Sequence, residues 1–285
     1  MEIKDVFENS SLPRLDTELL LAFSLKKSRE FLLSHLDYEI KPNLYKKFQT
    51  LENKRRQDWP VAYLIGVKEF YGLGFKVNPD VLTPRPETEK MVEDIVGLTK
   101  ESKFKKQLII DLGTGSGAII IAVAKELERT SPPAYRRAEF LAADISARAL
   151  KIAKQNAAEH RLLNKIKFYQ GDLLTPLKLD GRDLSHSELI IAANLPYLTK
   201  KQIKESPSIK HEPRLALDGG PDGLKYYRRL FKQLSILQNI GAVRVICEID
   251  DSQAGGIGVW AKKYFPHTQS KIVPDLSGKK RFLAL

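Results

Sequence analysis

The stretch LIIDLGTGSGAIIIAVA, Leu108 to Ala124, decides the fold because an apolar strand, a glycine-rich loop and an apolar helix follow one another in it. The strand ends at Asp111, and Gly113, Gly115 and Gly117 alternate before the helix begins. A loop without Cβ atoms allows a ligand to approach the backbone closely. This pattern indicates a nucleotide-like ligand, but it also serves NAD, and it also occurs as a tight turn without a ligand.

Beyond this stretch, apolar runs suited to strands alternate with helical patterns from about Glu87 onward. Further strands are expected in AEFLAADIS, KIKFYQGDLL, ELIIAANLPY, VRVICEID and the late segment QSKIVPDLSGKKRFLAL. Alternation of strand and helix is typical of a sheet whose strands are parallel and buried on both faces. The sequence therefore predicts an α/β domain with a doubly wound, mostly parallel sheet.

The N-terminal part has a different pattern. In LPRLDTELLLAFSLKKSREFLLSHL the apolar residues recur at three- and four-residue steps, which predicts helices only. Residues 60–84 contain short alternating strands broken by Gly72, Gly74 and Pro79, which predicts a β-hairpin between two domains. We expect a helical substrate-recognition domain over 1–58, a hairpin linker over 59–84 and a catalytic domain over 85–285.

Composition limits the class of protein. The chain has 285 residues, of which 42% are hydrophobic and 29% charged, so it can bury a normal core. A single cysteine, Cys247, excludes a disulfide framework, and we expect no metal site. No run has the length of a signal or membrane segment, so we expect a cytoplasmic monomer with no membrane partner. The net charge of +12 leaves nucleic-acid binding open, although the basic residues are scattered.

Acidic residues end the next two strands of the predicted sheet. Asp144 follows LAAD, where a carboxylate can accept hydrogen bonds from both hydroxyls of a ribose, although a helix N-cap is the alternative and Ser146 competes for it. Asp172 follows YQG, where it can accept a hydrogen from an adenine amino group or simply belong to a turn. Both positions suit an adenosine cofactor.

The fourth strand ends on Asn194-Leu195-Pro196-Tyr197. Asn and Pro also terminate strands with no further role. However, the carboxyl ends of parallel strands meet at the edge where doubly wound folds bind ligands, so this tetrapeptide is expected to face the cofactor. The tetrapeptide resembles a motif of methyltransferases that act on a planar amide or amino nitrogen, which is a poor nucleophile. By that resemblance the side-chain oxygen of Asn194 and a main-chain carbonyl near Leu195-Pro196 would accept the hydrogens of this nitrogen. Tyr197 would stack on the planar group, and Pro196 fixes φ.

These four loops resemble those of Rossmann-like S-adenosylmethionine-dependent methyltransferases, in which (Asn/Asp/Ser)-x-Pro-(Tyr/Phe) marks methylation of a planar nitrogen. Together with LPRLDTELLLAFSLKKSR, PVAYLIGVKEFYGLGFKVNPDVLTPRPETE and HEPRLALDGGPDGLKYYRRL, they are similar to the HemK/PrmC family of protein-glutamine methyltransferases. The resemblance runs from about residue 12 to the closing DLSGKKRFLAL. It implies methylation of the glutamine amide in the Gly-Gly-Gln motif of class 1 peptide chain release factors, which modulates translation termination.

The same resemblance implies roles for individual residues. S-adenosyl-L-methionine would be held by the glycine loop, the two acidic strand ends and the residue after the second of them, with Asn194 close by. These positions are Gly113, Thr114, Gly115, Ser116, Gly117, Asp144, Asp172, Leu173 and Asn194. The glutamine would be bound by Asn194, Leu195, Pro196 and Tyr197, of which Asn194, Pro196 and Tyr197 are the expected catalytic residues. The helical N-terminal domain would contact the release factor.

The sequence departs from the family pattern at two positions, and two other functions are alternative hypotheses. The family usually has proline where this chain has Leu195 and often has an aromatic residue where it has Leu173. Asn-Leu-Pro-Tyr also resembles the ribosomal RNA adenine dimethyltransferases, so nucleic-acid adenine methylation is the second hypothesis. The third is a non-catalytic RNA-binding or assembly protein with a methyltransferase fold. Glu212 and Arg214 are expected to form a structural ion pair.

Overall fold

The computed structural model describes residues 1–179, 183–275 and 277–285. The chain forms two compact units, one of Met1–Val67 with Ser206–His211 and the other of Lys68–Glu205 with Glu212–Leu285. Within the described ranges, every helix is too short or too polar to cross a membrane.

The first unit is helical, as the apolar periodicity predicts. Its helices are α1 (Ile3–Asn9), α2 (Arg14–Leu25), α3 (Arg29–Ser34), α4 (Pro42–Arg55), α5 (Val61–Ile65) and the short 3₁₀ helix η3 (Pro207–Ile209). Their apolar faces form one core that includes Ile3, Leu20, Leu32 and Phe48. The later segment of this unit is held by His211, whose ring stacks on Trp59 at 4.3 Å and donates from Nε2 to the carbonyl of Gln57 at 2.8 Å.

Helix α5 differs from the short strands expected after Pro60. Pro60 precedes the helix with a φ of −57°, and Gly66 ends it in the left-handed conformation with a φ of 80°. A proline before a helix and a glycine after it are its usual boundaries. The five residues between them therefore form one helical turn, although their apolar pattern also suits a strand.

The predicted β-hairpin is present further along. Strands β1 (Val67–Phe70) and β2 (Leu73–Lys76) form a two-stranded sheet. Tyr71 and Gly72 connect them with φ values of 53° and 70°. Two consecutive residues with positive φ match the twist of the flanking strands, which makes this the favoured two-residue hairpin turn.

The second unit contains a seven-stranded sheet in the order β5-β4-β3-β6-β7-β9-β8. The strands are β3 (Lys106–Leu112), β4 (Ala138–Asp144), β5 (Ile166–Gln170), β6 (Leu184–Ala193), β7 (Ile240–Glu248), β8 (Lys271–Pro274) and β9 (Lys280–Ala284). Strands β3 to β7 pair in parallel, and β8 and β9 add an antiparallel edge. The predicted doubly wound, mostly parallel sheet is confirmed.

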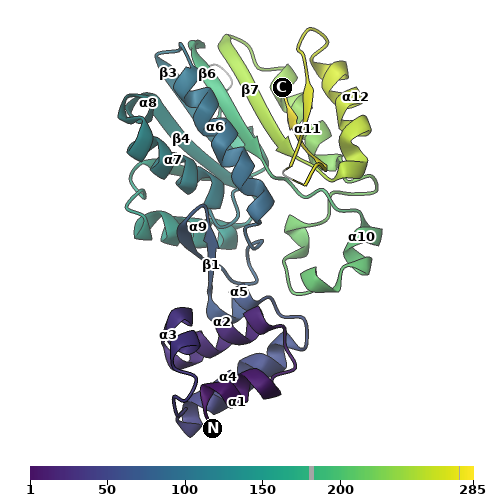
Figure 1. The fold of residues 1–285 in the computed structure, drawn as a ribbon. Coiled ribbons are helices and arrows are strands. Elements are labelled where there is room, and N and C mark those ends of the chain that lie inside the picture. The colour runs from purple at the N-terminus through teal and green to yellow at the C-terminus, as the bar shows by residue number, and fades with distance from the viewer. Residues whose placement is uncertain (180–182, 276) are drawn as a thin grey trace. The chain divides into compact units, whose positions relative to one another are not determined.

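Helices cover both faces of this sheet (Figure 1). They are α6 (Glu89–Glu101), α7 (Ala118–Thr130), α8 (Pro132–Arg137), α9 (Ala147–Glu159), α11 (Lys225–Ser235) and α12 (Ala254–Tyr264). The short helix α10 (Lys200–Glu205) lies away from the sheet and buries none of its residues. Along β3, Ile109 packs in the core with α6, α7 and α9, whereas Leu108 and Ile110 pack in the core with α11 and α12. Burial on both faces explains why the central strands are continuously apolar.

Asn156 of α9 connects three parts of the second unit. Its Oδ1 accepts from the backbone N–H of Lys76 at 2.8 Å, and its Nδ2 donates to the carbonyls of Lys76 at 3.1 Å and of Ser116 at 2.8 Å. The side chain is fully buried. Asn156 therefore holds the hairpin and the glycine loop on α9 through direct hydrogen bonds.

We expect Asn156→Ala to lower the free energy of unfolding by about 3 kcal/mol, because two part-buried backbone groups of Lys76 and the buried carbonyl of Ser116 lose their partner. Gln155→Ala changes the exposed neighbour on the same helix and should stay within about 0.5 kcal/mol of the parent protein. Denaturant unfolding of the two variants measures the difference. Equal stabilities would contradict the structural role of Asn156.

Candidate active site at the carboxyl edge of the sheet

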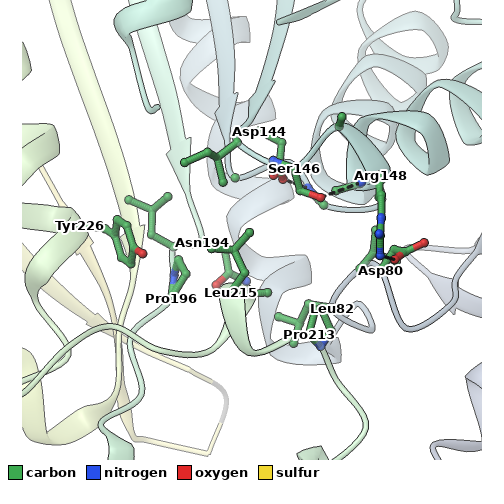
Figure 2. Close-up of a pocket in the computed structure, with 18 of the residues that line it drawn as sticks. Asp80, Leu82, Asp144, Ser146, Arg148, Asn194, Pro196, Pro213, Leu215 and Tyr226 are labelled. Carbon is green, nitrogen blue, oxygen red and sulfur yellow. Dashed lines mark hydrogen bonds and ion pairs between the residues drawn. The ribbon is translucent and has the colours of Figure 1, made fainter. Parts of the chain in front are cut away.

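A cavity of about 560 Å³ lies where strands β3, β4, β5 and β6 end. The size is in the range of small-molecule sites. In Figure 2, Asp144, Ser146 and Arg148 lie toward the right of the cavity, and Tyr226 and Pro196 lie toward the left. Eight of the residues selected from the sequence line it: Gly113, Gly115, Asp144, Asp172, Leu173, Asn194, Leu195 and Pro196.

The other residues selected in the glycine loop, Thr114, Ser116 and Gly117, do not line the cavity but support the loop from behind. Thr114 is buried and donates from Oγ1 to Oδ2 of Asp111 at 2.7 Å. Burial raises the pKa of the Asp111 carboxyl to about 7. Gly117 has a φ of 81°, and a Cβ there would lie 3.0 Å from Ile121 and 3.2 Å from Ala153. Gly117 thus permits α7 to pack on α9, and the side chain of Ser116 is buried.

Asp144 is held by the backbone of its own neighbourhood. Its Oδ1 accepts from the N–H of Ser146 at 2.8 Å, and its Oδ2 accepts from the N–H of Gly115 at 2.9 Å. Burial raises its pKa, and these backbone hydrogen bonds oppose the rise. Ser146, not Asp144, caps α9, since its Oγ accepts from the N–H of Ala149 at 3.2 Å. The carboxylate keeps lone pairs for two further donors in the cavity.

Asp172 has a partner that the sequence did not suggest. Its Oδ2 pairs with Nη2 of Arg229 at 2.5 Å and accepts from Nε2 of Gln233 at 3.5 Å. Gln233 also accepts from the N–H of Leu174 at 2.9 Å through its Oε1. Two side chains of α11 therefore position the turn after β5, in which Leu173 adopts a φ of 51°.

The tetrapeptide after β6 faces the cavity on one side and contacts buried side chains of the protein on the other. Asn194, Leu195 and Pro196 line the cavity. Tyr197 does not; its hydroxyl donates to Oε1 of Glu248 at 3.4 Å, and burial together with that carboxylate raises its pKa. On the protein side, Nδ2 of Asn194 donates to Oε2 of Glu248 at 3.0 Å and to Oγ1 of Thr88 at 3.3 Å.

Sequence reasoning missed Glu248, Thr88 and the cavity residue Tyr226. One signal for Glu248 existed, because it is the last residue of the apolar run VRVICE and therefore ends a neighbouring strand. Thr88 lies in the 3₁₀ turn η1 (Pro86–Thr88), within the segment PRPETE on which the family resemblance partly rests, but no local pattern distinguishes this residue from its neighbours.

The segment after α10 borders the tetrapeptide and the cavity. The predicted Glu212–Arg214 pair is wrong: Glu212 pairs with Arg85 at 2.6 Å, and Arg214 lies 3.9 Å from Asp218. Arg214 begins the 3₁₀ turn η4 (Arg214–Ala216), so its side chain is separated from that of Glu212. Leu215 of this turn lines the cavity and is 52% exposed, as is Ile145. Exposed apolar side chains at a cavity indicate a ligand-binding surface.

Gly219 lies directly against the backbone of the tetrapeptide. A Cβ at this position would lie 2.6 Å from the carbonyl oxygen of Pro196, 2.7 Å from Cα of Tyr197 and 2.8 Å from the carbonyl oxygen of Gly223. Leu198 pairs with Asp218 in a parallel bridge beside this contact. Gly219, the first glycine of the GG in HEPRLALDGG, therefore provides the space in which Pro196 and Tyr197 are held.

Comparison with known proteins matches both parts of the chain. Residues 2–66 match the model of the PrmC N-terminal domain, and residues 103–236 match that of a methyltransferase domain. The release factor glutamine methyltransferase of Moorella thermoacetica is 36% identical over 95% of this chain and 91% of its own length. The protein of that name from Coxiella burnetii is 42% identical over 75% of this chain and 71% of its own length.

Among solved structures, a human methyltransferase 10 domain containing protein has a TM-score of 0.51 with this chain at 16% identity. The match covers 86% of this chain and 97% of that one. At this identity the likeness shows the fold alone, and the fold is that of a Rossmann-like methyltransferase. A methyltransferase domain implies a methyl donor of the S-adenosylmethionine type.

We expect Gly219→Ala to lower the free energy of unfolding by about 1–3 kcal/mol, because its Cβ would overlap backbone atoms that have no room to move. Gly255→Ala, in α12, is the matched control: a Cβ there meets nothing within 4 Å, and alanine favours the helix. Denaturant unfolding compares them. A Gly219→Ala protein as stable as the control would refute the close approach.

Proposed function

Because the chain belongs to the family of release factor glutamine methyltransferases, we propose that it methylates the glutamine side-chain amide in the Gly-Gly-Gln motif of class 1 peptide chain release factors. One observation carries the proposal. Asn194 lines the cavity while its Nδ2 donates to Glu248 and Thr88 behind it, so its Oδ1 is the atom left for a ligand. A free amide oxygen accepts the N–H of a substrate amide.

The methyl donor on this proposal is S-adenosyl-L-methionine, and the cavity suits it in size and chemistry. Gly113 and Gly115 offer backbone without Cβ atoms, and the remaining lone pairs of Asp144 suit the two hydroxyls of a ribose. Ile145 and Leu173 provide apolar surface for a base. When bound, this cofactor supplies a methyl group on a positively charged sulfur.

The protein's own residues orient the acceptor for an in-line displacement. Oδ1 of Asn194 would accept one N–H of the glutamine amide, and a main-chain carbonyl near Pro196 would accept the other. Hydrogen bonds at both hydrogens fix the nitrogen and increase its electron density. Positioning of this kind supplies much of the rate of a bimolecular transfer. The nitrogen would form a bond to the methyl carbon as the bond between that carbon and the sulfur breaks, which leaves a neutral thioether, and one amide proton would pass to water.

Tyr197 has a revised place in this proposal. Its hydroxyl is tied to Glu248, and its ring packs against the core that contains α11 and α12. Tyr197 thus supports the backbone of the tetrapeptide. The part of its ring that stays exposed would stack on the glutamine. The neighbouring apolar surface of Pro196 and Leu215 is available to the rest of the motif.

The nucleic-acid hypothesis is not favoured. The relative from Moorella thermoacetica matches along 95% of the chain and is named for a protein glutamine substrate. An adenine methyltransferase has no need of residues 2–66, which match the PrmC N-terminal domain. On our proposal this helical unit contacts the release factor, the reaction occurs in the cytoplasm, and one chain suffices.

Transfer of labelled methyl groups from S-adenosyl-L-methionine to a purified class 1 release factor tests the substrate. We expect label on the intact factor, and none on ribosomal RNA or on a factor whose Gly-Gly-Gln glutamine is replaced by alanine. Asn194→Ala should reduce the rate at least about 100-fold, the usual effect of removing a group that stabilises the reacting atoms. Asn164→Ala, at an exposed asparagine, is the control. Label on RNA alone would reverse the choice of substrate.

Cofactor affinity tests the role of Asp144. We expect Asp144→Ala to weaken binding of S-adenosyl-L-methionine at least about tenfold, because hydrogen bonds to a charged group contribute about 1.5–3 kcal/mol. Asp37→Ala, at an exposed carboxylate of the helical unit, should leave the affinity unchanged. Calorimetric titration measures both. An unchanged affinity for Asp144→Ala would remove this residue from the cofactor site.

A further inference from the structure

A buried carboxylate lies behind the proposed substrate site without lining it. Glu248 is 2% exposed at the end of β7. Three donors converge on it, one from the turn η1 and two from the tetrapeptide. Oγ1 of Thr88 at 2.7 Å and Nδ2 of Asn194 at 3.0 Å donate to Oε2, and the hydroxyl of Tyr197 at 3.4 Å donates to Oε1. None of the cavity functions described above uses this group directly.

We propose that Glu248 is a positioning residue that sets which end of the Asn194 amide faces the cavity. An ionised carboxylate only accepts hydrogen bonds, so the Asn194 atom beside it must be the donor Nδ2. Oδ1 then faces the other way. The inference deepens the proposed function, on which its catalytic part rests, because an amide substrate requires an acceptor at that point.

The contact between Asn194 and Glu248 follows from the pairing of their two strands. Strands β6 and β7 pair in parallel with Ala193 opposite Cys247, which places Asn194 and Glu248 side by side one residue later. The hydroxyl of Tyr227, in α11, shares its one hydrogen between the carbonyl oxygens of Leu195, at 3.3 Å, and of Glu248. The two strand ends are therefore linked through one buried hydroxyl.

A second support holds the far end of the tetrapeptide. Nε2 of Gln253, in the 3₁₀ turn η5 (Asp251–Gln253), donates to the carbonyl of Tyr197 at 2.5 Å. The same nitrogen lies 3.5 Å from the carbonyl of Asp222. With the backbone held at both ends, the remaining freedom at Asn194 is the rotation of its side-chain amide, which Glu248 controls.

Protonation would remove this control. A neutral Glu248 carries an O–H that can donate, so the Asn194 amide could turn and present Nδ2 to the cavity. Burial raises the pKa of Glu248 to about 7; the hydrogen bond from Thr88, the positive charge of Arg281 and the Tyr197 hydroxyl oppose the rise, and Glu87 adds to it. Tyr227 is uncharged, because its own pKa is raised by burial.

The protonation state of Glu248 sets the direction of the pH effect on methyl transfer. Above pH 7 Glu248 is ionised and Asn194 offers its oxygen, whereas below pH 7 the carboxyl is protonated and the amide is free to turn. We expect the rate of methyl transfer to fall as the pH is lowered through about 7. Glu248→Gln should lower the rate at pH 8 by about 10–100-fold, as the loss of residues that orient metal ligands from behind does in other enzymes. The acidic limb should disappear in this variant.

The decisive measurement is the NMR signal of the Asn194 side-chain amide in the ligand-free protein, assigned by its loss in Asn194→Ala. In the parent protein we expect the signal to shift with pH, with a midpoint near 7. The shift should vanish in Glu248→Gln and persist in Glu188→Gln, a matched change of another buried glutamate, which lies in β6 away from the cavity. An Asn194 signal that is identical in the parent and Glu248→Gln proteins would overturn the proposal.

Thr88→Val provides a second test should Glu248→Gln fold poorly. It removes a hydrogen bond that lowers the pKa of Glu248, so the midpoint of the Asn194 signal and the acidic limb should both move to higher pH. Movement to lower pH, or none, would contradict the role of Glu248. Because the NMR experiment needs neither substrate nor cofactor, it stands even if no release factor is methylated, and the two proposals fail separately.

Discussion

The parallel pairing of β3 with β6 is the constraint on which the site depends. Leu112 lies opposite Ala193 in this pair, so the glycine loop and the tetrapeptide begin side by side at the same edge. A Cβ on Gly113 would lie only 3.2 Å from Cδ2 of Leu195. The strand order reverses at this pair, since β4 and β5 extend to one side and β7 to the other, and such a reversal is where doubly wound folds open a crevice. The loops that we propose to hold the methyl donor and the acceptor therefore meet because of the strand order in the sheet.

Buried carboxylates at the strand ends show how this arrangement is stabilised. Asp111, Asp144 and Glu248 all lie at strand ends, and burial raises the pKa of each. Burying a charge is unfavourable unless hydrogen bonds compensate it. Here the partners belong to the loops, so the same bonds that compensate the carboxylates also set the shape of those loops. Conformational freedom is lost where the proposed chemistry needs a fixed geometry.

The sequence predicted what depends on local pattern and missed what depends on register. Strand ends, the glycine loop and the tetrapeptide could be located, because apolar runs and their terminators are local signals. Glu248 became relevant only when β7 was known to lie beside β6, and Arg229 only when α11 was known to cover the turn at Asp172. The prediction for Glu212 failed for the same reason: its partner Arg85 lies 127 residues away. Side chains that hold loops from behind come from distant elements, and no local pattern identifies them.

The first unit is built from two separate stretches of the chain, which limits how it can be exchanged between relatives. Residues 206–211 belong with the helices of residues 1–67, and the stack of His211 on Trp59 joins the two stretches. The polypeptide therefore passes between the units three times, at residues 67–68, 205–206 and 211–212. A chimaera that exchanged only the contiguous N-terminal block with a relative would pair a foreign tryptophan position with the native histidine. Recombination that preserves the unit must transplant two separate stretches, one of which leads straight into Glu212 and the wall of the cavity.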